Sequence, residues 1–412
     1  METRSVVGAQ IPPAQLATSR AAAAPQEAPM PQDEVVVQSN MLQTGTRFHV
    51  PSPMELEGLS KGVPDGTKRI DVLKEVLHLD QVHAMGITGK GVTVAVIDTG
   101  TFPHEDYKAR LIGWKDMVND RPEPYDDNGH GTHCAGLVLG DGKMAGGKFQ
   151  GSAPEANLVG VKVLSGEGGG AMSDVIRGID WCVANKQKYN IRVMSLSLGA
   201  PAFQKERYDL VAKAIAKAYD AGIVPVIAAG NSGPFLETIG TPAISSKGLT
   251  VGAYDDKNTP NVADDTMAVF SSRGPTTRDR TIKPDIASPG VQLVATLSPK
   301  SMIDRENIPR YGDHYILLSG TSMATPVAAG IVADVIQANP DLTPGEVINL
   351  LKTTTRPIAD TNPLVQGAGL IDPLTAVKTA LAMRKPAAPA QAAPAAEQPA
   401  PQVEKKPLPA FA

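Results

Sequence analysis

Short apolar runs alternate with longer amphipathic stretches through the central part of the chain. Val92–Ile97 has a strand-forming residue at five of its six positions, which is typical of a strand buried on both faces of a parallel sheet. Runs of this kind predict strands at residues 92–97, 158–164, 192–198, 223–228 and 248–253. Amphipathic or small-residue stretches predict helices at residues 130–139, 173–188, 204–221, 322–338 and 344–353. The alternation predicts an α/β fold with three layers, a mostly parallel sheet with helices on both faces.

One folded domain is expected between two extensions. Residues 1–67 form an N-terminal extension whose first part is rich in Ala, Gln and Pro and predicted to be mostly disordered, although Val35–Val37 could form one extended segment. Residues 68–383 carry the predicted elements, and the apolar spacing from Arg69 to Met85 favours a helix at their start. Residues 384–412 form a Pro/Ala-rich tail, for which a solvated extension is favoured over a docking motif.

Composition and charge argue against several classes of protein. The net charge of −4 and the pI of about 6.0 indicate no basic surface for nucleic acid. No apolar run of about 18 residues predicts a membrane span, and the first 30 residues lack the apolar core of a secretory signal. We therefore expect a cytoplasmic protein, with export by a non-standard route as the alternative. Cys134 and Cys182 are too few for a disulfide scaffold, so free buried thiols are expected.

Two polar residues stand where the predicted strands and helices meet. Asp98 follows the run Val92–Ile97, at the edge where open α/β sheets bind ligands, although a turn aspartate before glycine is the alternative. His130 has a glycine on each side, which lets another group approach the imidazole closely. A loop histidine is the alternative, but two of the seven histidines fall within the one motif Gly-His-Gly-Thr-His.

Two further residues complete a possible reaction centre. Asn231 follows an apolar run in Ala-Ala-Gly-Asn-Ser-Gly, where its amide could donate to an oxyanion or simply form a turn. Ser322 lies in Gly-Thr-Ser-Met-Ala-Thr-Pro at the expected start of a helix, where free N–H groups favour developing negative charge. An N-cap serine is the alternative for Ser322.

The four residues occur in the order Asp98, His130, Asn231, Ser322, which contains the Asp–His–Ser order of subtilisin. Val-Ile-Asp-Thr-Gly, Gly-His-Gly-Thr-His-Cys-Ala-Gly, Ala-Ala-Gly-Asn and Gly-Thr-Ser-Met-Ala-Thr-Pro all match motifs of one family. The chain resembles the subtilisin-like serine proteases over roughly residues 68–383. Residues 154–164 and 189–199 look closest to the signal-less cytoplasmic bacterial branch of that family.

This resemblance implies a subtilisin-like fold and a serine endopeptidase that needs no cofactor for its chemistry. Ser322 would be the nucleophile, His130 the general base and acid, and Asp98 the partner that orients the imidazole. Asn231 and the Ser322 N–H would bind the oxyanion. A catalytically silent peptide-binding scaffold and an esterase or ligase on the same residues are the rival interpretations.

The resemblance also implies how a polypeptide substrate binds. Two edge segments would clamp it as an extended strand: Gly168, Gly169 and Gly170 on one side, and Ser197, Leu198 and Gly199 on the other. The glycine run could instead be a flexible loop, and it lacks the Gly-Lys-Ser/Thr ending of a phosphate-binding loop. Small residues would wall the first pocket, namely Ala228, Ala229, Gly230 and Gly240, which predicts Phe, Leu, Met or Tyr before the cut. Leu164 and Met172 are candidates for a second apolar pocket, with core packing as the alternative.

Three further residues or segments are of interest. Cys134 stands one helical turn after His130, so its thiol could lie near the imidazole, although packing is the simpler role. Asp106 is the nearest match to a calcium ligand of the family, although a solvated aspartate fits equally well. Gln43–Pro51 could lie over the cleft, which would make the N-terminal extension inhibitory. No nucleic acid or membrane partner is expected.

Overall fold

A computed structural model describes residues 47–51 and 71–384 of the chain. The disorder and the extended segment predicted for residues 1–45, and the nature of the tail after residue 384, lie outside the described residues. Within the described part, no helix is long and apolar enough to cross a membrane.

The five predicted strands are all present and lie side by side in one sheet. They are β2 (Thr93–Asp98), β4 (Asn157–Lys162), β6 (Ile191–Leu196), β7 (Val224–Ala228) and β8 (Leu249–Asp255). The order across the sheet is β10-β8-β7-β6-β2-β4-β3, and all of these neighbours pair in parallel. β3 (Leu111–Asp116) and β10 (Ile286–Pro289) form the two ends, and β9 (Thr266–Met267) pairs antiparallel with β8.

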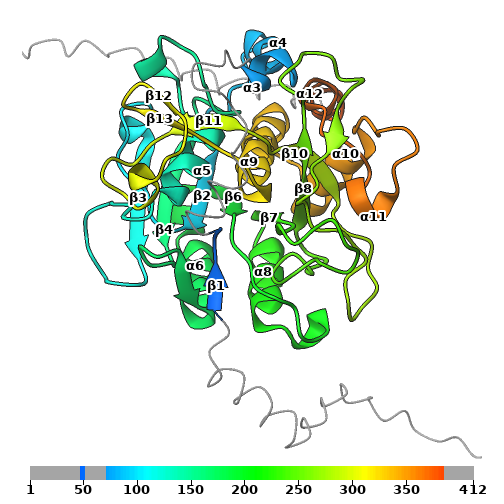
Figure 1. The fold of residues 1–412 in the computed structure, drawn as a ribbon, viewed down its shortest axis with the longest axis horizontal. Helices are drawn as coiled ribbons and strands as arrows, with labels where there is room; N and C mark the ends of the chain where they lie inside the picture. Colours follow the sequence, from blue (N-terminus) through cyan, green and yellow to red (C-terminus); the bar gives the residue numbers. More distant parts are fainter. Residues whose placement is uncertain (1–46, 52–70, 385–412) are drawn as a thin grey trace, which may run out of the picture. The chain divides into compact units, whose positions relative to one another are not determined.

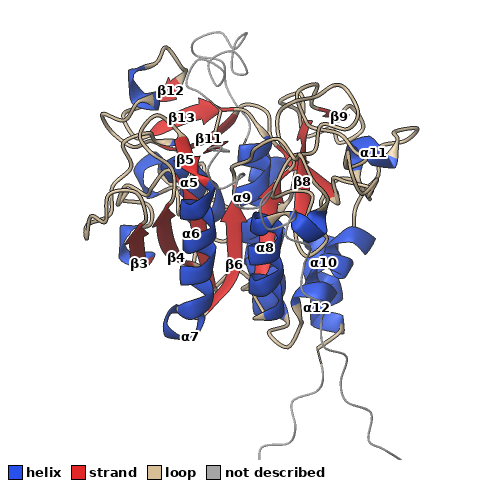
Figure 2. Ribbon diagram, turned by 90° about the horizontal axis from the view of Figure 1, so that it is seen from below, coloured by secondary structure: helices blue, strands red, loops and turns tan. Residues whose placement is uncertain are grey.

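Alternate residues of the central strands belong to two different cores, because successive side chains of a strand point to opposite faces. In β2, Val94 and Val96 join one buried cluster, whereas Ala95 and Ile97 join the other. The first cluster contains α5 (His130–Leu139), α9 (Thr321–Ala338), α10 (Pro344–Thr353) and α12 (Pro373–Ala382). The second contains α6 (Met172–Ala184) and α8 (Leu210–Asp220), which stand in front of the sheet in Figure 2. The three-layer α/β architecture predicted from the sequence is therefore confirmed.

Three predicted helices are interrupted in the structure. The helix expected at 173–188 breaks at Asn185 into α6 and α7 (Lys186–Tyr189). The one at 204–221 becomes a 3₁₀ turn, Glu206–Tyr208, followed by α8, whose N-cap Asp209 accepts bonds from the N–H groups of Val211 and Ala212. The stretch from Arg69 to Met85 gives two short helices, α3 (Val72–Glu75) and α4 (Leu79–Ala84), because His78 between them has a left-handed backbone with φ of 53°. Apolar spacing alone did not reveal these breaks.

Several short elements have no counterpart among the predictions. A small antiparallel sheet joins β11 (Leu293–Thr296), β13 (Tyr315–Leu318) and β12 (Arg310–Tyr311). β5 is Gly169–Ala171, and α11 is Pro363–Gln366. β3 and β10 were also not predicted. The sequence of β3, Leu-Ile-Gly-Trp-Lys-Asp, contains a glycine and a lysine, and that of β10, Ile-Ala-Ser-Pro, ends in a proline. Edge strands tolerate such residues, so their sequence pattern is weak.

A short strand, β1 (Arg47–His49), precedes the domain in the chain. It pairs antiparallel with β5, so that Arg47 faces Ala171 and His49 faces Gly169. On its other side, His49 and Gly199 exchange two backbone hydrogen bonds of 3.1 Å. β1 appears in Figure 1 as the blue strand beside α6. It is the middle strand between two segments of the domain.

The strand order also shows where a site should form. From β2 the chain proceeds to β3 and β4 on one side of the sheet, and later to β6, β7, β8 and β10 on the other. A crevice opens at such a reversal, outside the carboxyl ends of the strands. Asp98 ends β2, and Ser197 directly follows β6, so both lie at this reversal.

Candidate active site

Asp98 and His130 meet at the reversal between β2 and β6. The Asp98 Oδ1 atom lies 2.8 Å from His130 Nδ1 and also accepts the N–H of Thr99 at 2.7 Å. Both side chains are completely buried. Gly131 allows this contact, because a Cβ atom there would lie 2.2 Å from the Gly100 carbonyl oxygen and 3.1 Å from Asp98 Cβ. The imidazole is thus held through Nδ1, which leaves Nε2 able to accept or donate a proton.

Asp126 connects the two segments that carry this pair. Its Oδ1 accepts the hydroxyl of Thr99, next to Asp98, and the N–H of Gly129, next to His130, both at 2.9 Å. Its Oδ2 accepts the N–H and the hydroxyl of Thr132 at 2.8 and 2.7 Å. One buried carboxylate therefore fixes the end of β2 against the first turn of α5. Asp126 lies four residues before His130, but its sequence position alone did not predict this role.

The two histidines of α5 lie in different electrostatic environments. Burial alone would lower the pKa of His130, but the carboxylate of Asp98 and the thiol of Cys134 raise it well above its ordinary value of 6.5. Burial and the neighbouring His130 lower the pKa of His133 to about 3, so that side chain stays neutral. His133 Nε2 lies 3.1 Å from the Ile316 carbonyl oxygen. His130 and His133 therefore have pKa values shifted in opposite directions, although they stand three residues apart in α5.

Ser322 lies in the first turn of α9, as the sequence predicts, and its carbonyl has an unusual environment. Pro326 lies four residues later inside the helix and has no N–H to donate back to that carbonyl. Two side chains take its place: the Ser197 hydroxyl at 2.9 Å and the Cys134 thiol at 3.4 Å. The backbone of Ser322 is thereby tied to the end of β6 and to α5.

The Ser322 hydroxyl donates to the Ser197 carbonyl oxygen at 3.1 Å. His130 Nε2 is buried and makes no hydrogen bond to any residue that the structure describes. The structure therefore joins Asp98 to His130 by a hydrogen bond but leaves Ser322 turned to β6.

Asn231 lies three residues beyond the end of β7, and its side chain is fixed at one end. Its Oδ1 atom accepts the N–H of Thr321 at 2.9 Å and the Thr321 hydroxyl at 2.8 Å. The amide nitrogen Nδ2 is the part left to bind another group. A Cβ atom added at Gly320 would lie 3.4 Å from this nitrogen and 3.6 Å from the Ser322 backbone nitrogen. The two nitrogens therefore flank the space beside Gly320, whose φ of 153° also favours glycine.

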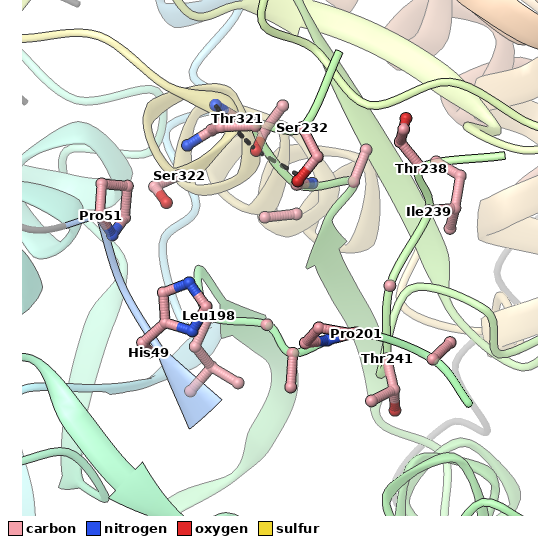
Figure 3. A pocket seen from close by; sticks show the side chains of 18 of the residues that line it. His49, Pro51, Leu198, Pro201, Ser232, Thr238, Ile239, Thr241, Thr321 and Ser322 are labelled. Atoms are coloured by element: carbon pink, nitrogen blue, oxygen red, sulfur yellow. Dashed lines mark hydrogen bonds between the residues drawn. The ribbon is translucent and has the colours of Figure 1, made fainter. Parts of the chain in front are cut away.

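A cavity of about 600 Å³ opens beside Ser322 and Asn231. Figure 3 shows Ser322, Leu198, Ile239 and Thr241 around it, with His49 and Pro51 of the N-terminal segment. Of the residues predicted for the substrate site, those lining the cavity are Ser197, Leu198, Gly199, Ala228, Ala229, Gly230 and Gly240. Gly168, Gly169 and Gly170 instead face β1, through the pairs His49–Gly169 and Phe48–Gly170 and a 3.1 Å bond from the Val50 N–H to the Gly168 carbonyl.

Comparison with known proteins agrees with this geometry. The profile of the Subtilase family matches residues 89–377 of the chain. The chain belongs to the Subtilase family. Subtilases of this kind are serine-type endopeptidases, and this chain is one of them.

Several relatives of this subtilase carry the names of proteases. It is 50% identical over 315 residues to Serine protease AprX of Bacillus subtilis (strain 168), covering 74% of this chain and 70% of that protein. It is 34% identical over 313 residues to Subtilisin BL of Lederbergia lenta, covering 76% of this chain and 98% of that protein. Among solved structures, Sphericase aligns with a TM-score of 0.59 at 28% identity, over 69% of this chain and 92% of that one.

The two cysteines of the subtilase are free and buried, as predicted. Cys134 Sγ lies 3.8 Å from His130 Nδ1, so the predicted proximity to the imidazole is confirmed. Burial raises the pKa of the Cys134 thiol, which keeps it protonated and able to donate to the Ser322 carbonyl. Cys134 thus packs and donates a hydrogen bond, and the reactive atoms lie on other residues.

Asp106 does not fit a calcium site in this subtilase. The side chain is buried, its Oδ1 accepts the N–H of Met144 at 3.1 Å, and its Oδ2 accepts the Tyr315 hydroxyl at 2.8 Å. Calcium requires several oxygen ligands, whereas both oxygens here already accept hydrogen bonds. Among the described residues, the one group of three His, Cys, Asp or Glu side chains at metal-ligand spacing is Asp98, His130 and Cys134. We assign no ion to Asp106.

Two cavity residues outside the predictions add charge and bulk. Ile239 and Glu237 line the pocket together with the predicted small residues. Glu237 forms an ion pair with Arg280, so its charge is balanced outside the pocket. Neither residue lies in a recognisable motif, and only the fold brings them to Ser322.

Proposed function

We propose that this subtilase cleaves internal peptide bonds by nucleophilic attack of Ser322, with His130, Asp98 and Asn231 in supporting roles. The observation that carries the proposal is the buried 2.8 Å contact between Asp98 Oδ1 and His130 Nδ1, which fixes the imidazole with Nε2 free. His130 differs from the other buried histidines of the described residues because its Nδ1 atom is held by the buried carboxylate of Asp98, which would stabilise the imidazolium. Its Nε2 atom makes no hydrogen bond to a described residue and is left to accept a proton.

The attack requires one local movement. In the structure the Ser322 hydroxyl donates to the Ser197 carbonyl, and rotation about its Cα–Cβ bond is the change that would turn it toward Nε2. His130 then accepts the hydroxyl proton as Oγ attacks the scissile carbonyl, and later gives it to the leaving amine. Asp98 stabilises the imidazolium that forms in between. Water repeats the sequence to release the acyl group from Ser322.

The tetrahedral oxyanion would lie beside Gly320. The Asn231 amide and the Ser322 N–H both flank that space, and Thr321 holds the Asn231 oxygen away from it. Donors fixed in advance around developing charge supply a large part of such catalysis. The N-terminal end of α9 adds its dipole in the same direction.

We further propose that the enzyme prefers Phe, Leu, Met or Tyr before the cut. Ala228, Ala229, Gly230 and Gly240 leave room for a large apolar side chain, and Ile239 adds an apolar wall. Glu237 would favour Lys or Arg only if its charge were free, and Arg280 balances it. Faster cleavage after Lys or Arg in a peptide library would contradict this preference.

A fluorophosphonate probe tests the nucleophile directly. The active protein should be labelled at Ser322, and digestion of a denatured protein should stop after labelling. Cut sites read by mass spectrometry would give the preference in the same experiment. Labelling without amide hydrolysis would instead indicate an esterase or a ligase, and absence of both would indicate a silent peptide-binding scaffold.

We also propose that the chain inhibits itself through residues 47–51. β1 is bound between β5 and Gly199 in the same way that an extended substrate would be. Phe48 is completely buried in the cluster that contains Leu164, with Met172 packed against it, which is the second apolar pocket of the sequence analysis. Pro51 reaches the cavity beside Ser322 (Figure 3). Residues 43–46, the rest of the segment proposed to cover the cleft, lie outside the described residues.

Pro51 explains why the hydroxyl of Ser322 is turned. The pair His49–Gly199 is antiparallel, so continuing the register by two residues sets Pro51 opposite Ser197. A residue at this position would normally donate its N–H to the Ser197 carbonyl, but proline has none. The Ser322 hydroxyl donates to that carbonyl instead. The bound segment would therefore hold the nucleophile in an unreactive rotamer.

Inhibition is tested on the full chain. Phe48→Ala should raise the initial rate on a small chromogenic peptide, because it removes the buried anchor of β1. Arg47→Ala is the matched control, since Arg47 is the exposed neighbour and should leave the rate unchanged. A truncated chain that begins at Gly66 should be fully active from the start. Equal initial rates for the truncated and full chains would contradict the proposal.

The location and ion content of the protein stay predictions. The cytoplasm is the predicted location, with non-standard export as the alternative, and fractionation of producing cells checks it. The proposed chemistry uses only side chains and backbone groups of this chain.

A further inference from the structure

The cavity beside Ser322 has very little charge in its wall. Of the described residues that line it, Glu237 alone is an aspartate, glutamate, lysine or arginine. The others are small, apolar or uncharged polar residues, apart from His49 of the N-terminal segment. Thr238 and Ile239, the next two residues of the same loop, stand on the cavity wall in Figure 3. The charge preference of this cavity therefore depends on Glu237 and on the group that balances it.

Arg280 is the group that balances Glu237. Its guanidinium forms an ion pair with Glu237 Oε1, and the side chains of Arg280 and Glu237 are 59% and 40% exposed. Arg278, the nearest other arginine in the same loop, is engaged elsewhere, because its Nε donates to the Phe203 carbonyl oxygen at 3.1 Å. An ion pair so open to water contributes little to stability. The pair therefore matters more for the charge beside the cavity than for holding the fold.

Hydrogen bonds other than the ion pair fasten the two loops together. The Glu237 N–H donates to the Gly274 carbonyl oxygen, and the Thr277 hydroxyl donates to the Glu237 carbonyl oxygen, both at 3.2 Å. The Thr238 N–H donates to the Arg273 carbonyl oxygen at 3.0 Å, and the Arg273 N–H donates to the Thr238 hydroxyl at 2.9 Å. These four bonds do not involve the side chain at position 280. A substitution there should therefore change the charge and leave the cavity wall in place.

The backbone of both partners gives a second indication that their side chains have a role. The φ angle is 63° at Glu237 and 59° at Arg280, so both residues have a left-handed backbone. Glycine adopts this conformation freely, whereas a residue with a side chain does so at a cost in free energy. Residues held in such conformations are often found at functional sites. Two charged residues in this conformation that also form an ion pair beside a cavity fit that pattern.

We propose that Arg280 is a positioning residue for substrate specificity, which holds the Glu237 carboxylate and so disfavours Lys and Arg before the cut. This inference rests on the proposed function, since it assigns the cavity to the residue before the scissile bond. With the ion pair intact, a basic substrate side chain finds no unbalanced carboxylate to offset its lost hydration, whereas an apolar side chain needs none. Without Arg280, the Glu237 carboxylate is free to pair with a basic side chain of the substrate.

The test uses the full chain and three chromogenic peptides that differ only in the residue before the cut, which is Phe, Lys or Glu. The readout is the ratio of kcat/KM values within one preparation, because a self-inhibited fraction cancels in that ratio. Arg280→Gln should raise the ratio of Lys to Phe cleavage on the order of 10-fold. The rise should shrink at high ionic strength, because salt screens exposed charges.

Four further variants show whether the effect comes from the ion pair. Arg278→Gln is the matched control, since it removes the same charge from the same loop and should keep the parent ratio. Arg280→Lys keeps the charge and should give a ratio close to that of the parent. Glu237→Gln leaves Arg280 unbalanced, so it should raise cleavage of the Glu peptide relative to the Phe peptide. Glu237→Gln added to Arg280→Gln should cancel the gain on the Lys peptide. A merely structural role would not make the preference follow the sign of the charge removed.

Two results would overturn the inference alone. The first is an Arg280→Gln protein that cleaves the Phe peptide but keeps the parent ratio of Lys to Phe cleavage, which would show that Glu237 does not act on the substrate. The second is a gain on the Lys peptide that persists after Glu237→Gln, which would assign the effect to another acidic group. Failure of the proposed function would look different, because the parent would then cleave none of the three peptides, and that result would remove this inference as well.

Discussion

Asp98 and His130 are fixed through their side chains, whereas Ser322 and Asn231 are fixed through neighbouring groups that leave their reacting atoms free. On the first side, Asp126 alone accepts four hydrogen bonds that join the two segments. On the second side, Thr321 holds the oxygen of Asn231, and Ser197 and Cys134 hold the carbonyl of Ser322. Asp98 and His130, which handle the proton, are therefore already held in place by hydrogen bonds. Ser322 keeps the rotation of its hydroxyl, and the Asn231 amide and the Ser322 N–H remain available as donors to the substrate. The difference suggests which substitutions should affect chemistry and which should affect pH response.

Ser322→Ala should have the largest effect, because it removes the attacking atom and leaves the surrounding contacts of α9 in place. We expect kcat to fall on the order of 10⁶-fold, the size measured for the same loss in a subtilisin. The Tm should stay within a few degrees of the parent. Residual turnover above about a thousandth of the parent rate would mean that another group attacks.

Asp98→Asn should act on the rigid half. It should lower kcat by about 10⁴-fold, since the amide no longer selects the productive imidazole tautomer. It should also change the pH profile. Asp98 raises the pKa of His130 above 6.5, and only the neutral imidazole accepts a proton, so activity of the parent should rise with pH above that value.

In the Asp98→Asn protein the acid limb of kcat/KM should move to lower pH, because the negative charge that stabilises the imidazolium is gone. The measurement is the pH dependence of kcat/KM for both proteins on one small peptide substrate. An unchanged limb would mean that the limb reports a group other than His130.

Asn231→Leu should remove one oxyanion donor and cost ~10²–10³ in kcat, again the size known from a subtilisin, with little change in KM. Gly320→Ala should cost a similar amount, since its methyl group would lie 3.4 Å from Asn231 Nδ2, in the space for the oxyanion. The double variant should be far less than additive, because both changes affect the same space. Full additivity in steady-state kinetics would show that the two positions act on different steps.

Asp334→Asn should have the smallest effect, on stability and not on turnover. Asp334 is buried in α9, and neither oxygen makes a hydrogen bond to a described residue. Burial raises its pKa well above 3.8, against a smaller opposing effect of the Gly89 N–H. The folded protein therefore keeps a proton that the unfolded chain releases, so the contribution of this group declines as pH rises from about 4 through its folded pKa.

In the Asp334→Asn protein this decline should be absent. In the parent, the free energy of unfolding should fall by at most about 1.4 kcal/mol per pH unit between about pH 4 and the folded pKa of Asp334. Denaturant unfolding at pH 5 and pH 9, in the Ser322→Ala background, checks it. The variant should gain stability relative to its parent at the higher pH. An equal difference at both pH values would contradict a neutral Asp334.

The sequence predicted the parts of the fold and site whose physical demands are local. The strand Thr93–Asp98 is apolar on both faces, so its burial could be predicted, and the aspartate at its end followed from the same pattern. β3 could not be predicted, because four of its six residues are only half-buried and its pattern is neither alternating nor fully apolar. The helix breaks at Asn185 and His78 depend on backbone turns that leave the apolar spacing unchanged.

The candidate site divides in the same way. Asp98, His130 and Ser322 stand in motifs, whereas Asp126, Ile239 and Glu237 act through contacts between segments far apart in the chain. Cys134 was predicted to lie near the imidazole because helical spacing is local. Its bond to the Ser322 carbonyl was not predictable, since it depends on the docking of α5 against α9 and on the missing N–H of Pro326.

Pro326 also affects the stage of folding at which the protein becomes able to cleave other proteins. The nucleophile's own carbonyl is satisfied only after residues 134, 197 and 322 have come together from three distant parts of the chain. Contacts of such long sequence separation form late in folding. A partly folded chain should therefore contain helices and a hydrophobic core but no functional active site. Proteolysis should begin only when the segments of residues 134, 197 and 322 have packed together.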